Sequence, residues 1–362
     1  MIFLKRFIVW TFLFIVTLIQ LLLYLPDFSC ISKNGGLPIC TSQFNFAIVD
    51  SSHITHDFIT SIRELLRLLS YLTIDMGWSS GLPAPDAYND ENLVDTFHLN
   101  NIYKVNYFGY CKKNGKQKEY CTSNHSSGMD ILALLVRDVG IQLGKLSSAY
   151  ENNTEILGES LVFTYELSLS SLHTFIKGDR QRGNILPKIV TNQGNEQTDL
   201  EYSSSKAYDK GVSLAYGLML FNEIMYFIHI FEITISVHCF LNVILFGFAL
   251  VWGKKQILLP TLLKITSSLL LVFASISFSG NLLYLLLLKM LEPDPTGITT
   301  TGWEMLEVKA GSGFIITCIR VGIQWIFLPV AFITSNHYIQ PKKQQTKIDE
   351  LKSDDESTVK QV

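Results

Sequence analysis

Besides Glu223, which lies off their face, three polar side chains suited to ion binding occur in a largely apolar part of the sequence: Asn222, His229 and Glu232. At about 100° per residue, they fall within roughly an 80° sector of one helix face. Ionisable residues inside a membrane typically mark ion paths, and carboxylate and carbonyl-type oxygens suit calcium. The spacing therefore predicts an ion path, which would require several subunits because one carboxylate is too few for a selective pore. The alternative is a hydrated helix end beside the membrane.

Four cysteines precede the second long apolar stretch, and they are candidates for disulfide bonds: Cys30, Cys40, Cys111 and Cys121. In an oxidising compartment this number predicts two disulfides, for which three connectivities are possible. We favour local pairing, Cys30 with Cys40 and Cys111 with Cys121, because each bond closes a short loop. Thiol catalysis would need a neighbouring base, and none is evident.

The dipeptide Asn114-Gly115 is a strong signal for a hairpin turn. A two-residue turn there would place Cys111 opposite Lys118 and not opposite Cys121. If these cysteines pair across adjacent strands, the turn must be longer or bulged.

The composition is that of a membrane protein. Hydrophobic residues make up 48% of the 362 residues and charged residues only 17%, against about 25% in soluble domains. The net charge of −3 indicates no nucleic-acid partner. Apolar stretches long enough to span a bilayer predict four transmembrane helices. The first is too long for the apolar core of a signal peptide, so we expect it to be retained.

Short basic flanks at Lys5/Arg6, Lys254/Lys255 and Lys342/Lys343 place both termini in the cytoplasm. Arg320, inside the fourth stretch, would either reach the membrane surface or pair with a carboxylate on a neighbouring helix. The predicted organisation is a cytoplasmic N-terminus (1–6), a first span (7–25), an extracellular domain (26–213), a second span (230–252), a cytoplasmic loop (253–264), a third span (265–288), an extracellular loop (289–312), a fourth span (313–335) and a disordered cytoplasmic tail (336–362).

Apolar periodicity within the extracellular segment predicts helices over 56–76, 129–150 and 160–176, and the aromatic, β-branched run 102–108 predicts a strand. Two sequons predict glycosylation at Asn124 and Asn152.

One short motif carries a family resemblance. The run Asn106-Tyr107-Phe108-Gly109-Tyr110-Cys111, followed after nine residues by Cys121, resembles the claudin-superfamily signature. The closer match is the fungal branch of mating-factor-induced claudin-like membrane proteins. Tyr107 and Phe108 match its apolar pair, and Gly109, Cys111 and Cys121 match the rest. Asn106 replaces the first glycine of the pattern.

The resemblance implies a claudin-like four-transmembrane-helix bundle, mainly α, with a large disulfide-stabilised α+β extracellular domain. It also implies a plasma-membrane regulator of low-affinity calcium influx and of membrane or cell fusion during fungal mating, located at the mating projection or cell contacts. The expected partners are the lipid bilayer, calcium ions, and further copies or other membrane proteins. The alternative is a non-transporting structural protein, similar to the SUR/PalI family, that organises plasma-membrane domains or cell contacts.

The sequence contains no G-x-S-x-G, P-loop, G-x-G-x-x-G or H-E-x-x-H motif. We therefore expect no enzymatic activity, and no catalytic residue, cofactor or metal site is predicted.

Overall fold

The computed structural model describes ten segments of the chain. They are residues 2–31, 40–50, 53–75, 93–114, 119–123, 127–147, 151–182, 198–251, 258–293 and 304–359. The chain divides into two compact units. We call Met1–Phe28, Phe227–Tyr284 and Ser312–Val362 the helical unit, and Ser29–Tyr226 with Leu285–Gly311 the sheet unit.

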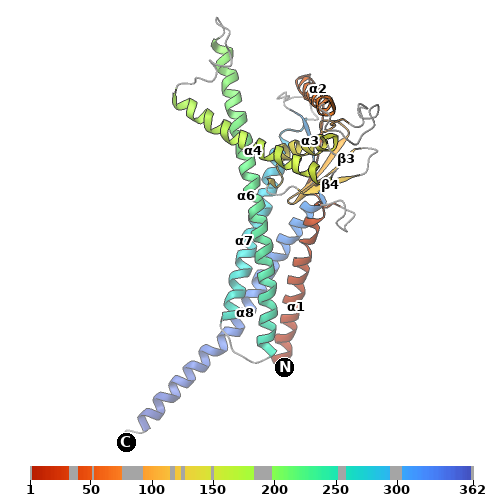
Figure 1. The fold of residues 1–362 in the computed structure, drawn as a ribbon. Helices are drawn as coiled ribbons and strands as arrows, with labels where there is room; N and C mark the ends of the chain where they lie inside the picture. The colour runs from red at the N-terminus through yellow and green to blue at the C-terminus, as the bar shows by residue number, and fades with distance from the viewer. Residues whose placement is uncertain are drawn as a thin grey trace. The chain divides into compact units, whose positions relative to one another are not determined.

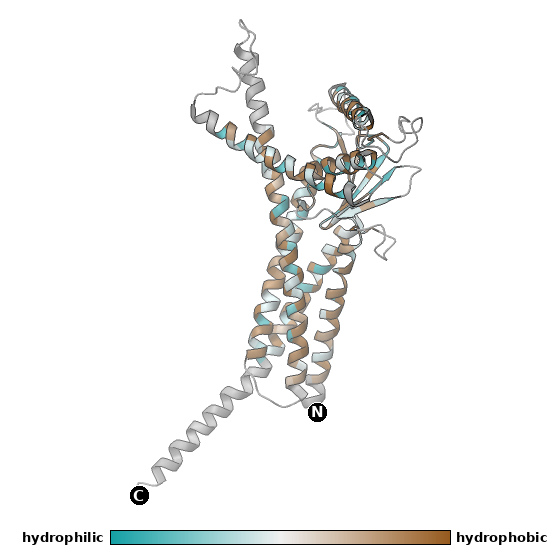
Figure 2. Cartoon of the chain, viewed as in Figure 1, coloured by the Kyte–Doolittle hydropathy of each residue, from teal (hydrophilic) through white to brown (hydrophobic). Residues whose placement is uncertain are grey.

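The described residues include four helices that are long and apolar enough to cross a membrane. They are α1 (Ile2–Leu22), which is followed by the 3₁₀ helix η1 (Leu25–Phe28), α6 (Thr198–Val251), α7 (Leu258–Lys289) and α8 (Ser312–Val359) (Figure 1). Hydrophobic residues dominate the parts of these helices that Figure 2 colours by hydropathy. Large apolar side chains such as Phe12, Phe248 and Trp325 are exposed, as expected for contact with lipid.

Apolar side chains from all four helices form a packed cluster in the helical unit. It contains Leu13, Cys239, Val243, Leu263, Leu270, Phe327 and Ala331. The Trp10 indole donates a hydrogen bond of 2.8 Å to the Val243 carbonyl oxygen. A Cβ atom at Gly247 would overlap that indole. The glycine therefore allows α1 and α6 to approach closely, as small residues do between membrane helices.

The sheet unit contains one antiparallel sheet in the order β4-β3-β2-β1-β5. Its strands are β1 (Phe44–Ile48), β2 (Asn101–Asn106), β3 (Gly109–Asn114), β4 (Tyr120–Ser123) and β5 (Leu306–Ala310). Phe44 of β1 lies opposite Val105 on one side and Ala310 on the other. The segment between α7 and α8 thus contributes an edge strand beside β1. Phe46 and Tyr103 stack across β1 and β2 with ring centroids 4.9 Å apart.

The sheet unit also contains α2 (His53–Asp75), α3 (Ile131–Ser147), α4 (Glu151–Arg182) and the part of α6 up to Tyr226. Small residues bring α3 and α4 very close together. A Cβ at Gly140 would lie 2.7 Å from the Cα atom of Gly158, and one at Gly144 would lie 2.7 Å from the Cα atom of Thr154. Both backbones would have to separate if either glycine carried a side chain.

The structure agrees with the coarse prediction, since the chain is mostly helical with four candidate membrane helices, a small sheet and disulfides. It differs at the C-terminal end. We predicted a disordered tail over 336–362, but α8 continues to Val359. The Lys, Gln and Glu residues after Pro341 are good helix formers, which accounts for the continuation.

Candidate functional site

The aromatic-glycine motif forms the turn of a β-hairpin. Asn106 ends β2 and pairs with Gly109, the first residue of β3, so that Tyr107 and Phe108 form the two-residue connection. The Asn106 side chain donates to the Thr41 carbonyl oxygen (2.6 Å) and accepts from the Tyr107 amide (2.7 Å). The asparagine therefore ties the hairpin to the residues before β1, a contact that a glycine could not make.

Gly109 lies where two backbones meet. A Cβ atom there would be 2.5 Å from the Cys30 carbonyl oxygen and 2.7 Å from that of Thr122. Both neighbours are backbone atoms, so a side chain would displace a strand. The aromatic residues differ in burial: Tyr107 is fully buried, whereas Phe108 is half-buried and meets the Tyr226 ring edge-on at 5.7 Å.

Two disulfides join the predicted cysteines in the pairing that we favoured, Cys30–Cys40 and Cys111–Cys121. Cys111 lies directly opposite Cys121 in the β3–β4 ladder, so the connection is longer than two residues. The sulfur atoms of Cys30, Cys40 and Cys111 lie within 4.8 Å of one another. Because disulfide sulfurs are not thiolates, this cluster holds two covalent crosslinks and not a metal ligand set.

A second group of polar residues lies inside the helical unit, and we call it the bundle network: Tyr24, Asp27, His229, Glu232 and Arg320. The His229 ring has Nε2 3.1 Å from Asp27 Oδ2 and Nδ1 3.2 Å from Glu232 Oε2. Arg320 Nη1 donates to Asp27 Oδ2 over 2.7 Å. The Tyr24 hydroxyl donates to Glu232 Oε1 (3.0 Å), and its ring lies 4.4 Å from the guanidinium.

The bundle network is almost completely buried. The side chains of Asp27, His229, Glu232 and Arg320 are 0–1% exposed. Only a doubly protonated imidazole can donate to both carboxylates. In that form the network contains two positive and two negative charges, as a buried charge cluster requires.

The structure brings together two of the three predicted ion-path residues. His229 and Glu232 share the bundle network, whereas Asn222 belongs to the sheet unit and donates its amide to the Leu218 carbonyl oxygen (3.0 Å). Arg320 pairs with a carboxylate, one of the two fates considered for it, but the partner Asp27 was not anticipated.

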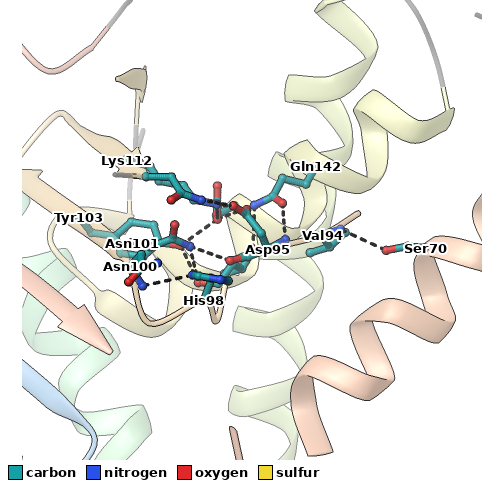
Figure 3. A network of polar contacts seen from close by, with 12 residues as sticks. Ser70, Val94, Asp95, His98, Asn100, Asn101, Tyr103, Lys112 and Gln142 are labelled. Carbon is teal, nitrogen blue, oxygen red and sulfur yellow. Dashed lines mark hydrogen bonds and ion pairs between the residues drawn. The ribbon is translucent and has the colours of Figure 1, made fainter. Parts of the chain in front are cut away.

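A third group of residues, which we call the Lys112 network, lies in the sheet unit and was not predicted (Figure 3). Lys112 on β3 pairs with Asp95 and, at 3.0 Å, with Asp138 on α3. Gln142 donates to Asp138 (2.7 Å), and the Tyr103 hydroxyl lies 2.9 Å from the same oxygen. Burial, and then the Asp138 charge, raise the pKa of Tyr103 well above its usual value. These bonds join the sheet, α3 and residues 93–100.

Asp130 precedes α3 and caps it, because its Oδ1 accepts a 3.0 Å bond from the Leu132 amide. Its other oxygen, Oδ2, is buried and has no hydrogen-bond partner among the described residues. Burial is the main reason that the pKa of Asp130 is raised to about 6.

Of the predicted glycosylation sites, Asn124 lies outside the described residues, and Asn152 is in the first turn of α4.

Four helices apolar enough to cross a membrane, with charges paired in their interior, and a disulfide-bonded sheet are the features of a membrane protein with a folded domain. A family model described as spore membrane assembly protein 2 matches residues 2–347. The chain therefore belongs to the spore membrane assembly protein 2 family. A relative of that name from Candida glabrata is 47% identical over 358 residues, which cover 94% of this chain and 96% of the relative. One from Saccharomyces cerevisiae S288c is 46% identical over 353 residues, 95% of each chain. No solved structure matches the chain.

This membership corrects the resemblance drawn from the sequence. The assignment to the mating-factor-induced claudin-like family is wrong, and the predicted roles in calcium influx, mating and cell fusion are wrong with it. The motif encodes a hairpin and its disulfide. Such a local structure does not specify a function, because one fold element serves many activities.

Proposed function

We propose that this protein acts in assembly of the spore membrane, as an integral membrane protein with a structural role. The observation that carries the proposal is the family match over residues 2–347, together with relatives named spore membrane assembly protein 2 that are 46–47% identical over nearly the whole chain. The proposed site of action is thus the spore membrane, in place of the plasma membrane at a mating projection.

A structural role, without enzymatic activity, is supported by the polar groups of the helical unit. The charged groups of its bundle network bond to one another and are nearly inaccessible to solvent. Such groups stabilise an arrangement of helices. A reactive site would instead need at least one group that can reach a substrate.

We also propose that the sheet unit faces away from the cytoplasm and that both termini are cytoplasmic. The two disulfides support this orientation, because disulfides persist in oxidising compartments. The basic flanks of the apolar stretches support it independently. A claudin-like arrangement is the finer proposal for the fold, supported by the Gly109 hairpin, the Cys111–Cys121 bond and the four candidate membrane helices.

Complementation tests the proposal directly. Sporulating Saccharomyces cerevisiae cells that lack their own relative would express this chain, and electron microscopy would score the fraction of spores enclosed by a continuous membrane. We expect this chain to restore enclosure, and Gly217→Ala to restore it equally because no atom lies within 4 Å of a Cβ at that position. A chain that is present in membranes at the relative's normal level, yet restores no enclosure, would overturn the proposal.

A further inference from the structure

The interior of the helical unit is polar at one end and apolar at the other. Its helices alternate in direction. Tyr24, just after α1, bonds Glu232 early in the unit's part of α6, and Ser335, further along α8 than Arg320, bonds the carbonyl oxygen of Pro260 early in α7. Most of the buried polar side chains lie at one end: Gln20, Tyr24, Asp27, His229, Glu232, Ser236, Ser277, Asn281, Thr317, Arg320 and Gln324. The others, Thr17, Ser267 and Ser335, each donate to a backbone carbonyl oxygen. The apolar cluster around Leu270 and Phe327 occupies the other end.

Two glutamines lie at the boundary between these halves. Arg320 of α8 stacks on Tyr24, which follows the end of α1, and Leu13 of α1 and Ala331 of α8 share the apolar cluster. Gln20 is four residues from Tyr24, and Gln324 is four residues from Arg320, each towards the apolar end. Because the two helices run in opposite directions, both glutamines lie at one level of the unit, about one turn from the bundle network.

These glutamines are buried without protein partners. Gln20 is 1% exposed and Gln324 0% exposed. Neither the amide nitrogen nor the amide oxygen of either side chain has a hydrogen-bond partner among the described residues, and Asp27 Oδ1 likewise has none. A buried polar atom left unpaired is destabilising, and more so where hydrocarbon surrounds the protein. Four such amide atoms at one level indicate that a small ligand binds there.

The chemistry of the site identifies that ligand. Each amide presents a donor and an acceptor, so a cation would satisfy only the oxygens and an anion only the nitrogens. The neighbouring charges are also balanced, because Arg320 and His229 face Asp27 and Glu232. A ligand that is neutral, very small, and both donor and acceptor fits the site, and water has these properties.

We propose that ordered water molecules occupy the polar half of the helical unit, where they bridge Gln20 and Gln324 and extend to Asp27 Oδ1. The packed side chains of Cys239, Leu270 and Phe327 end the hydrated region. The unit thus encloses water within the membrane without a polar path across it. The inference goes beyond the proposed role in membrane assembly and does not depend on it.

Water-edited solid-state NMR of the full chain in lipid bilayers tests the proposal. The side-chain amides of Gln20 and Gln324 would be compared with two references in the same protein. Exposed Asn100 is the wet reference, and the Trp10 indole, which bonds Val243 in the apolar half, is the dry one. We expect both glutamine amides to receive magnetisation from water severalfold faster than the indole and close to the rate of Asn100. Rates equal to that of the indole would overturn the proposal.

Variants assign the signals. Gln20→Met and Gln324→Met should each remove one pair of side-chain amide peaks while the Asn100 and Trp10 signals stay in place. If a methionine variant fails to fold, Gln20→Asn or Gln324→Asn retains an amide and assigns the peak by its shift. Direct through-space transfer between the two glutamine amides, without transfer from water, would show that they bond each other and would also contradict the proposal.

Discussion

The bundle network and the Lys112 network are both buried groups of charges, but their surroundings differ. In the bundle network the four charged side chains are 0–1% exposed, and all come from helices of the helical unit. In the Lys112 network the side chain of Lys112 is 9% exposed and that of Asp95 is 24% exposed. The Lys112 network also includes hydrogen bonds from side-chain amides and to backbone groups. One example is the bond of 2.6 Å that the Asn101 side chain donates to the Asp95 carbonyl oxygen.

The difference shows how much charge imbalance each environment tolerates. Lys112 faces two carboxylates and leaves the group with one excess negative charge, which Asp95 can place near water. The helical unit offers no comparable exposure, so its charges must balance within the network. Uncharged polar groups that have no partner in this network, such as the amides of Gln20 and Gln324, then need a neutral ligand.

The largest expected effect follows from removing the guanidinium of the bundle network. Arg320→Met leaves His229 as the only cation of the network beside Asp27 and Glu232, and a buried pair broken in this way costs about 3–5 kcal/mol. We expect a large fall in the thermal midpoint of the purified protein in detergent. Arg63→Met, on an exposed face of α2, serves as the control and should change little. An unchanged midpoint for Arg320→Met would show that the network does not stabilise the unit.

The matching change in the sheet unit is Lys112→Met. It leaves Asp138, which is 2% exposed, without its cation, but Asp95 can still be hydrated. We expect a loss of about 3 kcal/mol or less, measured by the same unfolding experiment. A loss larger than that of Arg320→Met would reverse the comparison between the two networks.

Asp130 gives a pH-dependent test of the cost of a buried charge without a partner, since one of its carboxylate oxygens has no hydrogen-bond partner among the described residues. Folding raises its pKa from 3.8 to about 6 and so favours the protonated acid. Stability is therefore highest at low pH for this group and falls as pH rises from about 4 to 6, by up to about 3 kcal/mol at 1.4 kcal/mol per unit. Asp130→Asn should keep the helix cap, remove this pH dependence and raise stability at pH 7. Glu64→Gln, on the exposed side of α2, should leave the dependence intact.

Gly109→Ala should produce the smallest of these losses, about 2 kcal/mol, because β3 must move away from Cys30 and Thr122. Unfolding of the sheet unit under non-reducing conditions measures it. Gly217→Ala is the matched control, since no atom lies within 4 Å of its added Cβ and alanine favours the helix. Equal stability of the two variants would contradict the close approach at Gly109.

Local patterns predicted much of the fold. Helical periodicity over 56–76, 129–150 and 160–176 led to α2, α3 and α4, whose observed bounds differ by several residues. The aromatic run that includes Tyr103 gave β2. Strand β5 was missed, because five residues between two apolar helices carry no periodicity that distinguishes a strand from a loop, and its partner β1 is far away in the sequence.

The candidate sites were predictable only where the signal was local. His229 and Glu232 are three residues apart on one helix, and their shared face was visible in the sequence. Asp27 is 202 positions from His229 and 293 from Arg320, so no spacing rule connects them. Lys112 stands beside Lys113 in a strand and resembled a solvent-facing residue, since two adjacent lysines give no sign that one is buried.

The pairing of β5 with β1 sets an order of events during synthesis. The ribosome makes β1 early, but β5, the second strand that pairs with β1, emerges only after α7 has been made. Until then β1 presents an unpaired edge, which is the kind of surface that aggregates or binds other chains. Completion of the sheet therefore waits for the third apolar helix to be made, so a nascent chain that stalls before residue 306 carries an open sheet edge.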